Sequence, residues 1–363
     1  MMTNRIATRY RFVVLLVLVV GVACGGSTPS APSELSGAAG PQTFYVSTAG
    51  NDRNGGSIAE PWKTLRFALG RMRAGDTLYL RAGTYTGPDN TIDSEIGTVP
   101  SGTSWSNPVV IGGYAGELVT IRPPGGMHGV RLTSGSPHYV IVQDLTIDMG
   151  NQVSNPESSP NGVYVSSGAN HNRFLRLDIK NAISFGLVFS PNNRNSPFNE
   201  VIDCRIHDNG FAGGDSRNGH GMYISTSDNL IEGNEIYDNR GFGIHFYNNA
   251  GPKLVARNIA RNNRIHGNGS NGGSIYGIAV AYGEGNVITR NEIYDNPGGI
   301  LVYTGSDQAE LSNNTIRTNR PLEGIMIQYA TATIVRDNVL YENGTDILDL
   351  GTTSVLAGNR RSP

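Results

Sequence analysis

The sequence is short of three things: cysteine, lysine and net charge. Two of its 363 residues are cysteine and three are lysine, and 28 basic residues nearly balance 30 acidic ones. The net charge of −2 argues against a nucleic-acid partner, because nucleic-acid binders carry strongly basic surfaces. Only 16% of the residues are charged, so polarity comes mainly from Asn, Ser, Thr and Gly, which suit tight turns better than long helices.

Long apolar runs are also missing, except near the start of the chain. Three arginines precede an apolar run over residues 12–20, which is too short to be a good membrane span. Basic residues followed by a short apolar run are typical of a signal peptide. We therefore predict that residues 1–24 are a targeting segment and that residues 25–42, which are rich in Gly, Ser and Pro, form a flexible linker.

The end of the targeting segment resembles a bacterial lipobox, in which small residues precede a Cys that is lipidated. Val20-Gly-Val-Ala-Cys24 carries the resemblance. It implies a lipid anchor at Cys24 as the sole membrane contact, and a place in the bacterial cell envelope, facing the periplasm or the cell surface. An ordinary signal peptide cut near Ala23 is the alternative. In the lipidated form Cys204 has no disulfide partner, and its position among repeated asparagines predicts a structural role.

A short sequence motif recurs along the rest of the chain: an apolar residue, an Asn three positions later, a turn, a Gly and an alternating apolar strand. Successive copies lie 23 to 32 residues apart, a period that indicates stacked structural units rather than one closed globule. The apolar position holds Ile147, Ile179, Ile206, Ile236, Ile265, Ile293, Ile316 and Leu340. The Asn position predicts a structural ladder of side-chain amides, formed by Asn209, Asn239, Asn268, Asn296, Asn319 and Asn343.

The segment before the repeats carries a family resemblance. Tyr45-Val-Ser, an amphipathic pattern over residues 62–72, and Ala74-Gly-Asp-Thr-Leu-Tyr-Leu followed by Gly83-Thr-Tyr resemble the beginning of secreted right-handed parallel β-helix proteins, the pectate and alginate lyase-like superfamily. The resemblance implies an all-β, single-stranded solenoid of roughly ten coils over residues 43–363. It also implies an N-terminal helix over 62–72 that caps the first coil.

Side chains alternate in the strand after each Gly, so the residues two and four positions after it point outward. Polar and aromatic residues in these positions concentrate in the middle coils, which also carry insertions at 151–160, 191–197, 211–218 and 248–253. Long loops beside one face of a regular array form the walls of a groove, which predicts a site there. The first outward column is Tyr164, Val188, Tyr223, His245, Ala279, Leu301, Met326 and Leu348, and the second is Ser166, Ser190, Ser225, Tyr247, Ala281, Tyr303, Gln328 and Leu350.

Tyr223 and His245 are the central candidates for catalysis. They occupy one outward column on adjacent coils, so we expect their Cα atoms about 4.8 Å apart. A Tyr beside a His suits general acid–base chemistry on a sugar ring. An aromatic pair that only packs, or stacks on a ligand, is an equally good interpretation.

Three neighbours complete the candidate catalytic set. Arg217 would neutralise a uronate carboxylate, and Asp215 or His220 would orient the reacting groups. Strand alternation points His220 inward, and places it about 10 Å from His245, too far for a shared metal. A structural role for His220 is therefore the alternative. The candidate substrate-binding residues are Tyr164, Tyr247 and Tyr303.

Other patterns in this region give weaker evidence for a catalytic or metal site. Gly219-His220-Gly221 resembles the G-H-G motif of polygalacturonases, pectin hydrolases of similar fold, but the paired carboxylates of an inverting hydrolase are missing from the neighbouring coils. Lys180 falls in a column on a different face, where we expect a surface role. No metal-ligand set is evident, although Asp203 and Asp208 leave room for Ca²⁺.

These observations predict an envelope-anchored, monomeric β-helix protein whose partner is an acidic, uronate-containing polysaccharide. The expected activity is that of a polysaccharide lyase or a C5-epimerase, since both reactions begin by removing the proton beside a uronate carboxylate. The alternative is a non-catalytic surface module that binds a glycan or a protein and uses its tyrosines as stacking platforms.

Overall fold

The computed structural model describes residues 40–150, 160–192, 194–210, 219–250, 254–270, 272 and 274–362. Gly40–Pro363 forms one compact unit. The predicted targeting segment, Cys24 and almost all of the predicted linker lie outside the described residues, as do Asp215 and Arg217. No helix within the described ranges is long and apolar enough to cross a bilayer.

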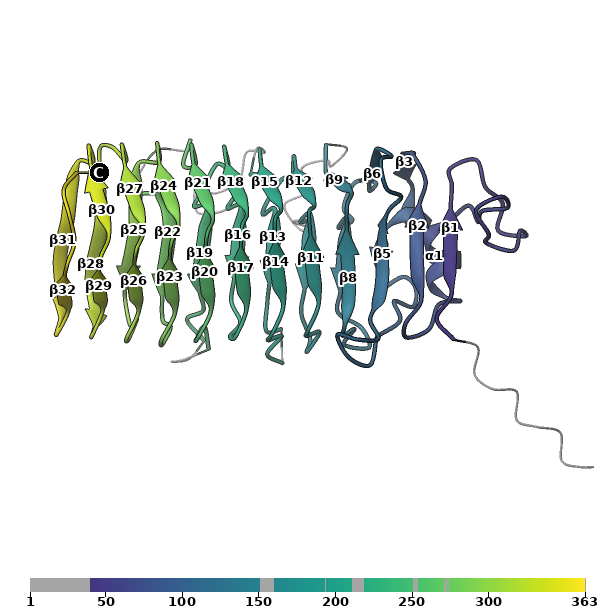
Figure 1. Cartoon of the computed structure of the whole chain (residues 1–363), viewed down its shortest axis with the longest axis horizontal. Helices are drawn as coiled ribbons and strands as arrows, with labels where there is room; N and C mark the ends of the chain where they lie inside the picture. The colour runs from purple at the N-terminus through teal and green to yellow at the C-terminus, as the bar shows by residue number, and fades with distance from the viewer. Residues whose placement is uncertain are drawn as a thin grey trace, which may run out of the picture. The chain divides into compact units, whose positions relative to one another are not determined.

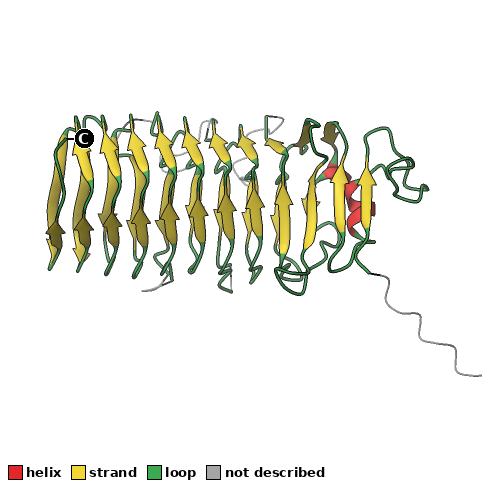
Figure 2. Cartoon of the chain, viewed as in Figure 1, coloured by secondary structure: helices red, strands yellow, loops and turns green. Residues whose placement is uncertain are grey.

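Short strands stack into three parallel sheets, so the described unit is the predicted right-handed parallel β-helix (Figure 1). Each complete coil contributes one strand to each sheet, consecutive coils lie side by side in chain order, and β1 and β32 extend sheet A at its two ends. Figure 2 shows that strands and turns make up nearly all of the unit. Sheet A, with twelve strands, comprises β1 (Thr43–Val46), β2 (Thr77–Leu80), β5 (Val109–Gly113), β8 (Val140–Gln143), β11 (Arg173–Leu175), β14 (Glu200–Ile202), β17 (Leu230–Glu232), β20 (Ile259–Arg261), β23 (Val287–Thr289), β26 (Glu310–Ser312), β29 (Ile334–Arg336) and β32 (Val355–Ala357).

The other two sheets have ten strands each. Sheet B comprises β3 (Gly83–Thr86), β6 (Val119–Arg122), β9 (Thr146–Asp148), β12 (Asp178–Lys180), β15 (Arg205–His207), β18 (Glu235–Tyr237), β21 (Arg264–His266), β24 (Glu292–Tyr294), β27 (Thr315–Arg317) and β30 (Val339–Tyr341). Sheet C comprises β4 (Ile92–Asp93), β7 (Val130–Leu132), β10 (Val163–Val165), β13 (Leu187–Phe189), β16 (Met222–Ile224), β19 (Ile244–Tyr247), β22 (Tyr276–Ala281), β25 (Gly298–Tyr303), β28 (Glu323–Thr331) and β31 (Thr345–Thr352).

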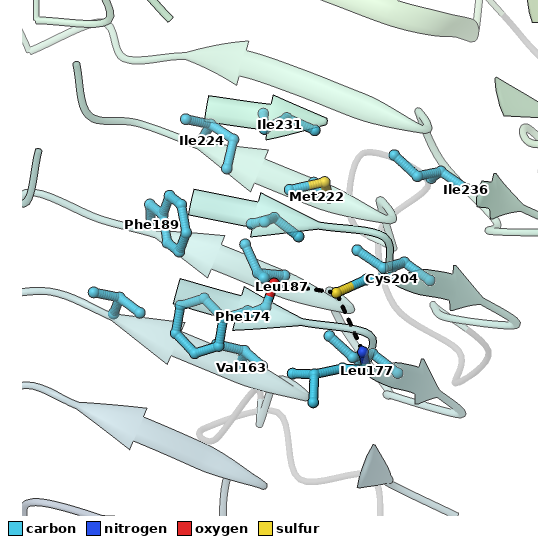
Figure 3. Packing of buried hydrophobic residues seen from close by; sticks show 14 of the residues in the cluster. Val163, Phe174, Leu177, Leu187, Phe189, Cys204, Met222, Ile224, Ile231 and Ile236 are labelled. Atoms are coloured by element: carbon cyan, nitrogen blue, oxygen red, sulfur yellow. Dashed lines mark hydrogen bonds between the residues drawn. The ribbon is translucent and has the colours of Figure 1, made fainter. Parts of the chain in front are cut away.

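The hydrophobic core is the continuous interior enclosed by the three sheets. The predicted apolar column from Ile147 to Leu340 is at most 1% exposed and lies in register on consecutive strands of sheet B. Figure 3 shows Phe174, Phe189 and Met222 packed inside successive coils. Because one coil cannot bury its own apolar side chains, this stacking is what makes the short strands stable.

The N-terminal helix is shorter than the predicted range of 62–72. Helix α1 spans Leu65–Leu69, begins at Thr64, whose hydroxyl accepts a hydrogen bond from Phe67 N at 3.3 Å, and ends at Gly70. Three of its side chains are buried and belong to the core. Trp62 is not helical because its backbone instead pairs with the first strand, where Trp62 N donates to Tyr45 O at 2.9 Å.

The predicted Asn ladder is confirmed. Asn209 Nδ2 donates to Asn239 Oδ1 at 2.8 Å, and Asn239 Nδ2 donates to Asn268 Oδ1 at 2.9 Å, all within the buried turn between sheets B and C. Cys204 lies in a second such column, since its backbone N donates to Asn234 Oδ1 at 2.9 Å. Its buried sulfur contacts the backbone of Phe174 and Leu177 (Figure 3), as expected for a structural thiol.

Candidate functional site

The candidate site lies on the outer face of sheet C, where the predicted columns are in register. Tyr223 pairs with His245 on the adjacent strand, and the column continues through Ala279 to Leu301. In the second column Tyr247 pairs with Ala281, which pairs with Tyr303. Strands β16, β19, β22 and β25 therefore position the site, and the alternation of short parallel strands decides which side chains face outward.

Tyr223 and His245 contact each other as predicted. Their ring centroids are 5.5 Å apart in an edge-to-face arrangement, and Phe185 stacks on the other side of Tyr223 at 5.1 Å. Tyr247 lies 5.1 Å from His245 and 5.5 Å from Tyr282. The rings form an aromatic wall around His245.

The predicted separation of about 10 Å between His220 and His245 is wrong. Their rings are 4.9 Å apart, and His220 Nε2 lies 3.2 Å from His245 Nδ1. His220 precedes β16, which begins at Met222, so the alternation of that strand does not extend to His220. Gly241 makes room for the ring, because a Cβ there would overlap His220 Nδ1.

A chain of hydrogen bonds runs through both histidines to Tyr303. Phe242 N donates to His220 Nδ1 at 3.1 Å. His220 Nε2 and His245 Nδ1 share the next bond, and His245 Nε2 lies 2.9 Å from the Tyr303 hydroxyl. The chain thus links a backbone amide to a phenol across four strands of sheet C.

Two alanines allow Tyr303 to reach His245. Tyr303 belongs to β25 and His245 to β19, so β22 lies between them. The outward residues of β22 at these positions are Ala279 and Ala281, both completely buried. Two strand spacings amount to about 9.6 Å, a gap that the Tyr and His side chains span together above the small alanines.

Burial keeps both histidines uncharged. His220 is 1% exposed and His245 is 7% exposed. Desolvation lowers the pKa of His220 to about 3, and desolvation together with the repulsion that a protonated His220 would exert lowers the pKa of His245 well below its usual range. Burial raises the pKa of Tyr223 and Tyr303, so both phenols hold their protons at neutral pH.

Tyr164 lies apart from the other predicted substrate-binding residues, because Val188 separates it from Tyr223 in the column. It stacks on His128 at 5.0 Å, and burial lowers the pKa of His128 to about 4. The prediction missed this end of the face, although Arg131 and Asp93 continue the same column in β7 and β4.

Arg131 forms an ion pair with Asp93 on that part of the face. Arg131 Nε donates to Asp93 Oδ1 at 2.7 Å, and the Asp93 side chain is fully buried. Among the described residues nothing bonds to Asp93 Oδ2. Extending the alternating pattern backward from Tyr164 would have found both residues.

Lys180 and the acidic residues considered for calcium lie on or beside sheet B. Lys180 bonds to Asp178 at 3.3 Å, and Asp208 bonds to His207 at 2.7 Å. Lys180 is thus on a different face from Tyr223, as expected. Within the described ranges, no group of three acidic, His or Cys side chains is placed to hold a metal ion.

Comparisons with known proteins find β-helix relatives. A family described as "Pel9A-like, right handed beta helix region" matches residues 44–214, and "Periplasmic copper-binding protein (NosD)" matches 255–360. Pectate lyase PEL9 of Emericella nidulans is 41% identical over 78 residues, which cover 22% of this chain but only 18% of that protein.

Two solved structures resemble the chain over most of its length. Pectate lyase Pel9A has a TM-score of 0.61 at 17% identity, and the match covers 87% of this chain and 79% of that one. An alginate lyase from Paenibacillus sp. has a TM-score of 0.63 at 18% identity, covering 86% and 99%. At these identities the likeness establishes the fold alone.

Proposed function

Because the chain has the right-handed parallel β-helix fold of pectate lyase-like proteins, we propose that it acts on an acidic polysaccharide. The proposed reaction is β-elimination or C5-epimerisation of a uronate-containing chain by a monomer held in the cell envelope through Cys24. The observation that carries the proposal is the pair of buried, uncharged histidines bonded to Tyr303 beside Tyr223. Clusters of titratable groups with strongly shifted pKa values concentrate at functional sites.

The proposed roles follow from the placement of these groups. Tyr223 and His245 share the base and acid roles. Arg217 neutralises that carboxylate, and Asp215 or His220 orients the reacting groups. Both Asp215 and Arg217 belong to the segment 211–218, directly before His220. Tyr164, Tyr247 and Tyr303 contact the sugar chain.

Activity on defined polysaccharides tests the proposal. The full-length protein is incubated with alginate, pectate and glycosaminoglycans, while ultraviolet absorbance follows the unsaturated product and NMR follows the epimer ratio. Tyr223→Phe should lower kcat by about 10²–10⁴-fold, the usual contribution of a general acid or base. Tyr329→Phe is the matched control, because Tyr329 is 74% exposed. Unchanged absorbance and epimer ratio with every uronan would refute the proposal.

A glycan-binding module without catalysis is the second candidate. The observation that favours it is the aromatic face itself, since Tyr164, Tyr223, Tyr247 and Tyr303 are all partly buried on sheet C. Tyrosine rings bind sugars by stacking and offer a hydroxyl at the edge. For this candidate, Ala at Tyr223 and His245 weakens polysaccharide affinity stepwise while no turnover is detected. For the enzyme, the same substitutions abolish turnover and leave binding in place.

A further inference from the structure

We infer that His220 and His245 form a one-way hydrogen-bond relay whose last group, the Tyr303 hydroxyl, donates the proton to the substrate. The inference moves the acid role proposed above for His245 to Tyr303, and His245 becomes a positioning residue that acts through Tyr303. The catalytic part of this inference rests on the proposed function, whereas the direction of the relay does not.

The direction of the relay follows from the Phe242 amide. This backbone N–H donates to His220 Nδ1, so Nδ1 carries no proton. A neutral His220 must then be protonated on Nε2, which donates to His245 Nδ1. The same reasoning places the proton of His245 on Nε2, which donates to the Tyr303 oxygen. The reverse order would need a proton on His220 Nδ1, where the Phe242 amide already points.

Within the part of the chain that the structure describes, the Tyr303 hydroxyl bonds to His245 alone, which leaves this group to meet a ligand. Both nitrogens of each imidazole are occupied by hydrogen bonds, and both rings are almost completely buried. The Tyr303 oxygen accepts from His245, so its own proton is free to point elsewhere, and Tyr303 is only partly buried. The other ionisable groups near the Tyr303 hydroxyl are the phenols of Tyr223, Tyr247 and Tyr282. Phenols carry no charge at neutral pH, so among the described residues the hydrogen bond from His245 is the contact that polarises the Tyr303 hydroxyl.

The chemistry of β-elimination then balances. Tyr223 first releases its own proton to solvent, and its oxygen then takes the C5 proton while the electron pair of that C–H bond forms the C4–C5 double bond. The C4–O bond breaks, and the departing glycosidic oxygen keeps its electron pair and takes the Tyr303 proton. The tyrosinate formed on Tyr303 is stabilised by the hydrogen bond from His245 Nε2–H. Solvent then returns a proton to Tyr303, while Tyr223 keeps the proton taken from C5, so both phenols are restored.

NMR of the full-length protein with isotope-labelled histidine tests the direction without any substrate. We expect His220 and His245 to be neutral at neutral pH and protonated on Nε2. Tyr303→Phe should shift the Nε2 resonance of His245 and leave the tautomer of His220 unchanged. A proton on Nδ1 of His245, or a cationic imidazole at neutral pH, would overturn the relay.

A matched pair of substitutions tests the catalytic part. The amide nitrogen of Gln can replace a histidine Nε2–H, whereas Asn reaches only the Nδ1 position. His245→Gln should therefore retain more kcat than His245→Asn, and Tyr303→Phe should lower kcat by about 10²–10⁴-fold with little change in KM. A purely structural His245 would make the two variants equal, and a fully active Tyr303→Phe would remove Tyr303 from the reaction.

The two proposals fail in different ways. If no uronan is turned over, the proposed function fails, while the histidine tautomers still report on the relay. If turnover is found but the tautomers are reversed, the relay fails and the proposed function stands.

Discussion

Replacing Asn239 by Ala should destabilise the solenoid more than its small size suggests. Asn239 is fully buried in the ladder between sheets B and C. Its Oδ1 accepts from Asn209 Nδ2 at 2.8 Å and from Asn209 N at 3.3 Å, and its Nδ2 donates to Ile206 O at 2.9 Å. Alanine removes these partners from Asn209 N and Ile206 O, whereas Asn209 Nδ2 keeps its bond to Ile179 O at 3.4 Å. Each of the two groups costs about 1–3 kcal/mol, so we expect a loss of about 2–6 kcal/mol in unfolding free energy.

Asn343→Ala is the matched control, because Asn343 ends the same ladder and is only partly buried. It accepts from Asn319 N at 3.1 Å and donates to Ile316 O at 2.9 Å, but water can replace these bonds, so we expect a loss of about 1 kcal/mol. Urea unfolding followed by circular dichroism measures both variants, and hydrogen exchange shows whether amides near Asn209 lose protection. Equal losses in the two variants would refute the argument from burial.

Three further predictions concern the site and the core. Acid should destabilise the fold, because His220, with its pKa of about 3, binds no proton as the pH falls from about 6.5 while the unfolded chain does. The unfolding free energy falls by about 2 kcal/mol at pH ~5. His220→Gln should flatten the measured dependence of unfolding free energy on pH, and an unchanged slope would contradict this prediction. Cys204→Asn should extend the second ladder and preserve stability or raise it by about 1 kcal/mol, whereas Cys204→Ala should lower it; thermal unfolding compares the two. Gly241→Ala should displace His220 and reduce turnover about tenfold or more, because the displaced ring loses at least one hydrogen bond. The circular dichroism spectrum should stay native, and wild-type turnover would show that His220 does not need this space.

Several features of the fold were predictable because they depend on local periods. The repeat fixes which residue of each coil faces the core, since a strand alternates with period two and the coils are in register. Ile236 and Asn239 could thus be assigned to the core and the ladder from the sequence, and Tyr223 and His245 to adjacent strands. The predicted anchor at Cys24 and the roles of Asp215 and Arg217 remain predictions, since these residues lie outside the described ranges.

The helix shows where local patterns fall short. The apolar residues within 62–72 have the spacing of an amphipathic helix, yet of these residues only Leu65–Leu69 is helical. Trp62 pairs its backbone with β1 and stacks its ring on Phe44 at 4.8 Å, so tertiary contacts override the local preference.

The sequence by itself determined the coil, the inward and outward faces, and the columns in which candidate residues stand. Only the tertiary structure decided which of their atoms meet. His220 lies before the first residue of β16, outside the alternation of that strand, and Tyr303 reaches across β22 because Ala279 and Ala281 leave room above it. A period describes backbone positions, whereas hydrogen bonds depend on side-chain direction and on the size of neighbours from distant parts of the chain. That difference is why the repeat located Tyr223 and His245 but not the relay that joins His220, His245 and Tyr303.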